Sequence, residues 1–132
     1  MAEPILEVRD LVVRYRKRGM FGAPPPPAVN AASFTLPRGQ TLGIVGESGS
    51  GKSSLLRAIL RLVPTESGTI RLDGKDWLSL SGAELQAARR DIGVVAQNPF
   101  LSLSPRLTIA EIIAEPLVAQ AVAKGSEIRN RA

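Results

Sequence analysis

Residues 46–53 read Gly46-Glu47-Ser48-Gly49-Ser50-Gly51-Lys52-Ser53. This fits the pattern glycine, any four residues, glycine-lysine-serine, which is the phosphate-binding P-loop signature. The apolar run 41–45 before it is typical of a strand. Residues 53–62 after it predict an amphipathic helix, with Leu55, Leu56, Ile59, Leu60 and Leu62 on or near one stripe. Strand, glycine-rich turn and helix in this order make a P-loop more plausible than a surface turn followed by an exposed lysine.

The residue types in this loop suit a polyphosphate. Glycines at 46, 49 and 51 let the backbone turn tightly and present N–H groups to anionic oxygens. The following helix directs its positive N-terminal end at the same anion. Lys52 supplies a cation for the terminal phosphates. The Ser53 hydroxyl is suited to ligate a Mg²⁺ ion that bridges phosphate oxygens.

The amino-acid composition limits which other kinds of site and ligand the chain can have. The chain has 132 residues, enough for one small domain, and it contains neither cysteine nor histidine. Disulfides, thiolate metal sites, a cysteine nucleophile and a histidine base are thereby excluded within these residues. The net charge of +5 suits an anionic ligand, but it would also suit nucleic acid or an anionic membrane surface. Residues 1–7 do not resemble a secretory signal, and residues 107–123 carry too many polar groups for a membrane span, so we expect a cytoplasmic chain.

The rest of the chain alternates strand and helix signals, which predicts an α/β fold. Strands are expected at 5–15, 29–36, 69–72 and, as a buried strand, 92–96. The proline-rich loop 19–28 separates the first two. Helices are expected at 83–90, with Ser81 as N-cap, and from Thr108 onward, interrupted or kinked by Pro116. We treat residues 1–132 as a single domain.

Two segments together resemble the ATP-binding subunit of ABC transporters. They are residues 46–53 and the run Gln97-Asn98-Pro99-Phe100-Leu101-Ser102-Leu103-Ser104-Pro105-Arg106. Within that family the chain is most similar to the oligopeptide, dipeptide and nickel importers, on Glu47-Ser48, the Ser-Leu-x-Pro-Arg segment and Glu115-Pro116-Leu117. The resemblance covers residues 5 to about 125. It implies a RecA-like P-loop NTPase core with an N-terminal antiparallel β subdomain, and ATP and Mg²⁺ as cofactors.

The resemblance also implies a role for each matching residue. Tyr15 stands where the family stacks an aromatic ring on adenine; physics alone weighs this evenly against an ordinary strand-end tyrosine. Phe21 is a weaker candidate. Gln97 matches the glutamine that contacts Mg²⁺ or the attacking water, although from the residue alone a solvent-facing glutamine is favoured. The expected ATP-binding residues are Tyr15, Gly46, Glu47, Ser48, Gly49, Ser50, Gly51, Lys52, Ser53, Ser54 and Gln97, with Ser53 and Gln97 also at the metal.

Other parts of the family pattern are missing. Residues 80–86 look like its Leu-Ser-Gly-Gly-Gln motif, but they precede Gln97 and lack the second glycine, so we interpret them as a helix N-terminus. The Walker B carboxylates and the switch histidine are absent, so no catalytic residue is assigned. We therefore expect the N-terminal part of a longer subunit, truncated before its helical subdomain is complete. It would grip ATP but hydrolyse it negligibly alone.

The resemblance further implies partners. Membrane permease subunits would dock near Gln97 to Phe100, a second ATP-binding subunit would complete a homo- or heterodimer, and a solute-binding protein would act indirectly. The location would be the inner face of the cell membrane, and the role would be the import of peptides or a related solute.

Two alternative functions stay open: a non-hydrolytic nucleotide-binding remnant without a transport role, and a nucleic-acid-binding domain using Arg14 to Arg18. The second is disfavoured because the run is short and matches no base-reading motif.

Overall fold

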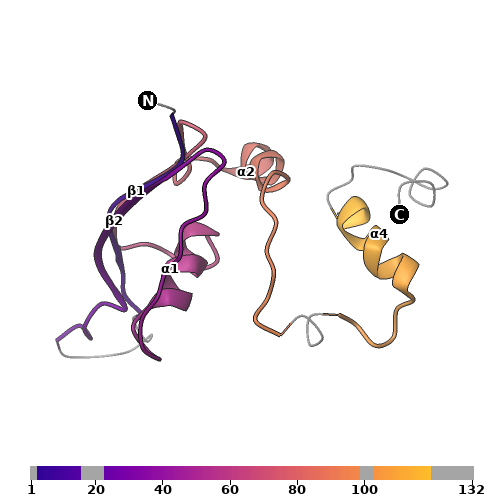
Figure 1. The fold of residues 1–132 in the computed structure, drawn as a ribbon, viewed down its shortest axis with the longest axis horizontal. Coiled ribbons are helices and arrows are strands. Elements are labelled where there is room, and N and C mark those ends of the chain that lie inside the picture. Colours follow the sequence, from indigo (N-terminus) through magenta and orange to yellow (C-terminus); the bar gives the residue numbers. More distant parts are fainter. Residues whose placement is uncertain (1–2, 16–22, 99–102, 120–132) are drawn as a thin grey trace. The chain divides into compact units, whose positions relative to one another are not determined.

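The computed structural model describes residues 3–15, 23–98 and 103–119. These residues fall into two compact units, Met1–Leu80 and Ser81–Ala132. The first unit carries the sheet and the glycine-rich loop, and the described residues of the second include the helices α2 and α4 (Figure 1).

The sheet of the first unit is antiparallel throughout. Its strands are β1 (Pro4–Val13), β2 (Val29–Pro37), β3 (Ser67–Leu72) and β4 (Lys75–Asp76), in the spatial order β2-β1-β3-β4. β1 is central, so that Val8 pairs with Phe34 of β2 on one side and with Ile70 of β3 on the other. The expected strands at 5–15, 29–36 and 69–72 are confirmed, and with them the N-terminal antiparallel layer.

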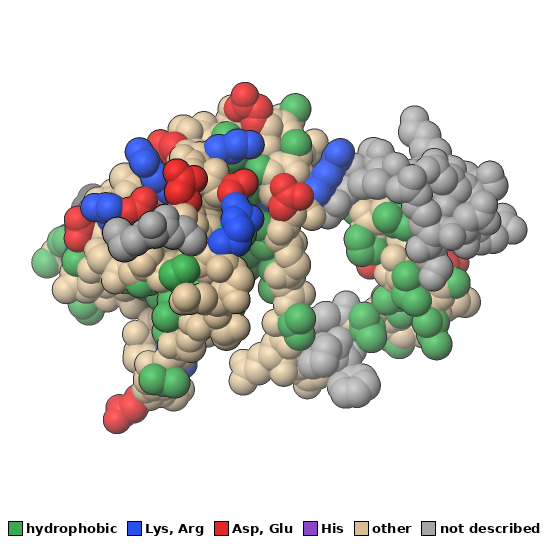
Figure 2. Space-filling view, turned by 45° about the horizontal axis from the view of Figure 1, so that its top comes forward, with side chains coloured by type: hydrophobic (Ala, Val, Ile, Leu, Met, Phe, Trp, Pro, Cys, Tyr) green, Lys and Arg blue, Asp and Glu red, His purple; other side chains and the backbone are tan. Residues whose placement is uncertain are grey.

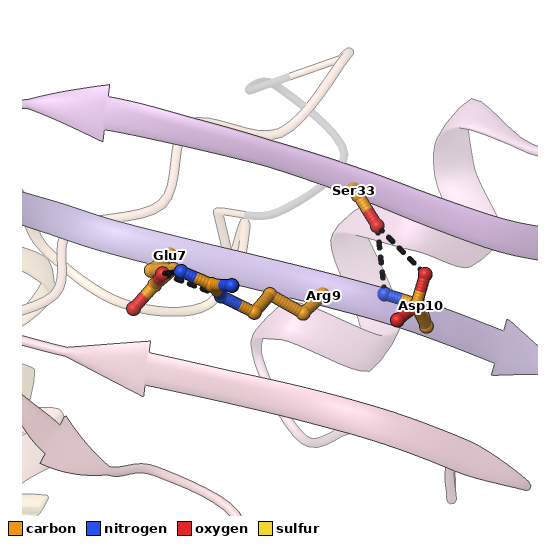
Figure 3. A network of polar contacts seen from close by, with 4 residues as sticks. All are labelled: Glu7, Arg9, Asp10 and Ser33. Atoms are coloured by element: carbon orange, nitrogen blue, oxygen red, sulfur yellow. Dashed lines mark hydrogen bonds and ion pairs between the residues drawn. The ribbon is translucent and has the colours of Figure 1, made fainter.

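A β-bulge in β1 keeps its apolar side chains on one face. Asp10 has a φ of 48°, and the pairing register with β2 shifts between Val8 and Leu11. Ser33 of β2 points at this irregularity: its Oγ accepts a hydrogen bond of 2.8 Å from the Asp10 N–H and donates one to the Asp10 carboxylate (Figure 3). The nearby Glu7 and Arg9 side chains pair along the same strand. The extra residue allows both Val8 and Leu11 to be buried although they are three positions apart.

Helix α1 (Lys52–Ile59) contributes Leu55 and Ala58 to the core, while Leu56 remains 51% exposed. The predicted apolar stripe is therefore only partly buried. The core of the first unit consists of residues from the sheet, from α1 and from the segment after β4: Val8, Leu11, Val13, Val29, Leu55, Ala58, Ile70 and Trp77.

Trp77 joins the end of α1 to the sheet. Its indole N–H donates to the Ile59 carbonyl at 2.7 Å, and its backbone N–H donates to the Ile70 carbonyl at 2.9 Å. Arg61, which has a φ of 54°, donates to the Trp77 carbonyl at 3.1 Å. Because Trp77 is 1% exposed and is the chain's one tryptophan, its fluorescence reports on the packing of the first unit.

Two strand predictions are wrong for this structure. Residues 41–45 and 92–96 form no strand, and their side chains stand largely in solvent, with Val45 94% and Val95 89% exposed. A strand requires a hydrogen-bonded neighbour, and the described residues place none beside either segment. The expected burial of residues 92–96 is therefore wrong for this structure as well, because an apolar pattern leads to burial only where a packing partner is present.

The second unit contains α2 (Gly82–Arg89) and α4 (Ile109–Ala119). Ser81 is the N-cap residue of α2, as predicted, so residues 80–86 are a helix start. Helix α4 begins after Thr108, also as predicted, but it runs through Pro116 to Ala119, so the predicted interruption is wrong. A proline removes one backbone hydrogen bond, and α4 continues despite that loss. Within the described part of the chain no helix reaches the length and apolarity of a membrane span.

Thr108 and Glu111 form a reciprocal cap at the start of α4. The Glu111 carboxylate accepts hydrogen bonds of 2.8 Å from the Thr108 N–H and hydroxyl, and the Thr108 Oγ1 accepts one of 3.3 Å from the Glu111 N–H. These hydrogen bonds lower the pKa of Glu111 from its ordinary value of 4.5. The bond from the Thr108 backbone N–H has the larger effect, and the bond from the Thr108 hydroxyl has the smaller one. A lowered pKa means that the ionised carboxylate favours the helix, so the cap is fully formed at neutral pH.

We expect the first turn of α4 to loosen as the pH falls through the lowered pKa of Glu111. The Thr108 amide resonance, followed by NMR, should titrate below pH 4.5. The Thr108→Val variant keeps the backbone donor and should move this pKa part of the way back. In Glu111→Gln, which has no carboxylate at this position, the titration should vanish. An unchanged titration in Glu111→Gln would assign the effect to another group.

Candidate functional site

The glycine-rich loop has the tight backbone that its sequence predicts. Gly49 and Gly51 have left-handed φ values of 83° and 95°, and the Ser50 N–H donates to the Glu47 carbonyl at 3.2 Å. A Cβ on Gly51 would lie 2.1 Å from the Ala28 carbonyl oxygen, so the loop runs against the start of β2. Glycine is therefore required at position 51 both by conformation and by space.

Lys52 folds back over the loop that precedes it. Its ammonium nitrogen donates to the carbonyl oxygens of Gly46 at 2.7 Å and Glu47 at 2.6 Å, and to the Ser50 hydroxyl at 3.3 Å. All three protons of the ammonium group are thus directed into the loop. The positive charge lies where the loop and the N-terminus of α1 meet, which is where an anion would be stabilised most.

Tyr15 lies beside the first turn of α1. Its hydroxyl donates to the Ser54 Oγ at 3.2 Å, although the two residues are 39 positions apart. The tyrosine is 46% exposed, so a flat ligand can reach the side chain. The structure therefore brings the predicted base-stacking residue to the predicted phosphate loop, and Ser54 links the two.

Arg14 was not recognised from sequence as part of this region. Its Nε donates to the Glu66 carboxylate at 2.7 Å, and its Nη1 donates to the Pro25 carbonyl. From sequence alone Arg14 is the first residue of a basic run that is typical of a solvated loop, and its two partners are 52 and 11 positions away. The long-range pairing carries no local sequence signal that could have revealed it.

The other predicted site residues are placed as follows. Ser53 is exposed in the first turn of α1. Gln97 belongs to the second unit, where it is exposed in a bend after residues 92–96. Its predicted contact with Mg²⁺ stays a prediction. Phe21, Pro99 and Phe100 lie outside the described residues.

The residues in the first unit fit a nucleotide polyphosphate. They offer backbone N–H groups in a glycine loop, one ammonium group, the hydroxyls of Ser53 and Ser54, and an accessible aromatic residue. Among the described residues there is no cluster of three or more carboxylate, histidine or cysteine side chains that could hold a metal by itself. A metal at this site would therefore be coordinated by the Ser53 hydroxyl together with the phosphates it accompanies.

Curated proteins resemble this chain over nearly all of its length. The glutathione import ATP-binding protein GsiA of Pectobacterium atrosepticum is 45% identical over 98% of this chain, and so is GsiA of Escherichia coli K12. This chain spans 21% of the length of either relative.

Solved structures agree on the fold. The ATP-binding cassette MJ0796, in a dimeric post-hydrolysis state with ADP and Pi, aligns with a TM-score of 0.75 and 29% identity. The alignment covers 96% of this chain and 53% of that one, and a second dimeric structure of MJ0796, described as a bacterial ABC transporter cassette, gives the same values. Residues 29–131 match the family described as ABC transporter. The chain therefore belongs to the ABC transporter family, as the P-loop and the segment that begins at Gln97 had indicated.

Proposed function

We propose that this chain binds Mg-ATP and supplies the nucleotide-gripping part of an ABC importer ATPase. The observation that carries the proposal is the ammonium group of Lys52, held by three contacts inside the loop 46–53 at the start of α1. Membership of the family supports it. The same arrangement of glycine turn, cation and helix N-terminus stabilises polyphosphates in general.

Each residue has a distinct task in this proposal. The loop N–H groups and Lys52 hold the β- and γ-phosphates, and Ser53 and Gln97 provide oxygen ligands for Mg²⁺, which neutralises phosphate charge when bound. Ser54 holds Tyr15 through its hydroxyl and contacts phosphate, as the resemblance implies. Tyr15 presents its ring to adenine.

The wider role follows from the relatives. GsiA proteins are named for glutathione import, and we propose import of a peptide or a related small solute for the protein that contains this chain. Permease subunits would dock around Gln97 to Phe100, and a second ATP-binding subunit would face the loop. A solute-binding protein would deliver the cargo without touching this chain. The location would be cytoplasmic, on the inner face of the membrane.

Titration of the purified chain with Mg-ATP tests the proposal directly. We expect saturable, Mg²⁺-dependent binding in a calorimeter, because Ser53 and the phosphates need the metal as a bridge. Trp77 fluorescence serves to confirm that the first unit is folded in the same sample. A folded chain without saturable binding would overturn the proposal.

We also expect these 132 residues alone to turn over ATP negligibly. Phosphoryl transfer needs an oriented nucleophile as well as charge stabilisation, and the Walker B carboxylates and switch histidine of the family pattern are not among these residues. Phosphate release should match the spontaneous rate even with ATP bound. Steady turnover that disappears in Lys52→Ala would show that this expectation is wrong.

Binding of nucleic acid is a weaker reading of the same basic chain. On the face shown in Figure 2, acidic and basic side chains are interspersed rather than gathered into a basic patch. Arg9, Arg14 and Arg38 are each paired with a carboxylate, from Glu7, Glu66 and Asp73. Neutralised arginines contribute little to phosphate-backbone affinity.

A further inference from the structure

We propose that Arg14 is a positioning residue that sets Tyr15 for the adenine base. This inference rests on the proposed ATP-binding function of the loop, and it adds to the site a residue that lies outside the P-loop motif. Arg14 precedes Tyr15 directly, just beyond the end of β1. Its guanidinium joins two segments that lie on either side of the site in the sequence, the proline run before β2 and the turn before β3.

Both segments that Arg14 joins are hydrogen-bonded to β1. The backbone N–H of Glu66 donates to the Val12 carbonyl at 2.8 Å, so its carboxylate is presented from a fixed position. On the other side, the Ala28 N–H donates to the Val13 carbonyl at 2.7 Å, three residues after Pro25. The Arg14 guanidinium therefore spans two segments that are each hydrogen-bonded to β1, and the Arg14 side chain is only 17% exposed.

One of the two segments that Arg14 joins also contacts the phosphate loop. The Ala28 carbonyl is the group against which Gly51 is packed, and Gly51 is the N-cap residue of α1, which carries Ser54. Tyr15 is thus fixed at its hydroxyl by Ser54 and at its backbone by the residue before it. Loss of the Arg14 guanidinium contacts would free the backbone of Tyr15, so its ring would lose its orientation toward a base. The phosphate loop would keep its own contacts.

An arginine is needed for this geometry. Guanidinium donors point in fixed directions from one plane, which allows Nε to bind Glu66 while Nη1 binds the Pro25 carbonyl. A lysine at position 14 could satisfy one partner at a time. Because Glu66 balances its charge, Arg14 is not a source of attraction for phosphates. Arg14 should therefore affect the binding of the adenine base and leave the binding of the triphosphate unchanged.

The test compares Mg-ATP with inorganic Mg-tripolyphosphate in the full chain. In Arg14→Ala we expect the affinity for Mg-ATP to fall about two- to tenfold, the range for an aromatic stacking contact, while tripolyphosphate affinity stays unchanged. Arg14→Lys should give an intermediate loss. Arg9→Ala is the matched control, because Arg9 lies on β1, which leads directly to Arg14, and is also paired with a glutamate; it should change neither affinity.

The possible outcomes separate the alternatives. Equal loss of affinity for both ligands in Arg14→Lys, with Trp77 fluorescence unchanged, would mean that Arg14 supports the phosphate loop rather than Tyr15, and would overturn the inference. Unchanged Mg-ATP affinity in Arg14→Ala would overturn it as well. A wild-type chain that is folded but binds neither ligand would instead overturn the proposed function.

Discussion

Replacing Lys52 with alanine is expected to lower the affinity for Mg-ATP by roughly 100-fold, because charge-assisted hydrogen bonds are among the strongest single contacts. The ammonium group lies inside the loop and donates to Gly46, Glu47 and Ser50. Phosphate oxygens are stronger acceptors than these groups, so the ammonium can redirect its hydrogen bonds to them without leaving the loop. In the alanine variant that charge is lost, while the loop carbonyls can turn to water.

Calorimetric titration with Mg-ATP and with Mg-tripolyphosphate measures this effect. Both affinities should fall together, in contrast to Arg14→Ala, because Lys52 acts on the phosphates. Lys75→Ala provides a matched control, since Lys75 is an exposed lysine on β4 of the same unit. Full-strength binding by a folded Lys52→Ala chain would place the nucleotide elsewhere and remove the basis of the proposed function.

Replacing Gly68 with alanine is expected to destabilise the first unit by about 3 kcal/mol or more, since backbone strain and overpacking each cost about 1–3 kcal/mol. Gly68 lies in β3 with a φ of 97°. A Cβ there would lie 2.6 Å from the Asp10 carbonyl oxygen and the Leu11 Cα, and 2.7 Å from the Arg9 carbonyl oxygen. These are backbone atoms of the β1 bulge, so they cannot turn away as a side chain could.

Denaturant unfolding followed by Trp77 fluorescence gives the change in the free energy of unfolding. Gly74→Ala is the control: its φ is 74°, but a Cβ there meets nothing within 4 Å. It should therefore show the conformational cost without the collision, roughly 1 kcal/mol. Equal effects of the two substitutions would mean that the contact between Gly68 and the bulge can relax.

Local patterns in the sequence were enough for the elements that depend on neighbouring residues. The strands β1 to β3 follow from the alternation of apolar residues, and the starts of α2 after Ser81 and of α4 after Thr108 follow from residue types that favour helix N-termini. The glycine loop belongs to the same class, because its conformation is set by its own glycines.

Features that depend on distant partners could not be predicted in this way. Apolar residues at 41–45 and 92–96 indicate strands, yet the described chain offers them no hydrogen-bonding neighbour. The Asp10 bulge requires Ser33 and Gly68 to face it from two other strands. Arg14 gains its role from Glu66 and Pro25, neither of which marks the arginine in sequence.

The central position of β1 determines the order in which its two strand pairs can form during synthesis of the chain. β1 is made first and can pair with β2 as a local hairpin, but its second edge waits for β3. The P-loop and α1 emerge between those two events, so the pairing of β1 with β3 closes a loop of chain that contains them. Because closing a long loop is slow relative to forming a hairpin, the nucleotide-binding segment is completed late. A nascent chain that ends before β3 carries the whole P-loop sequence while one side of β1 is still unpaired.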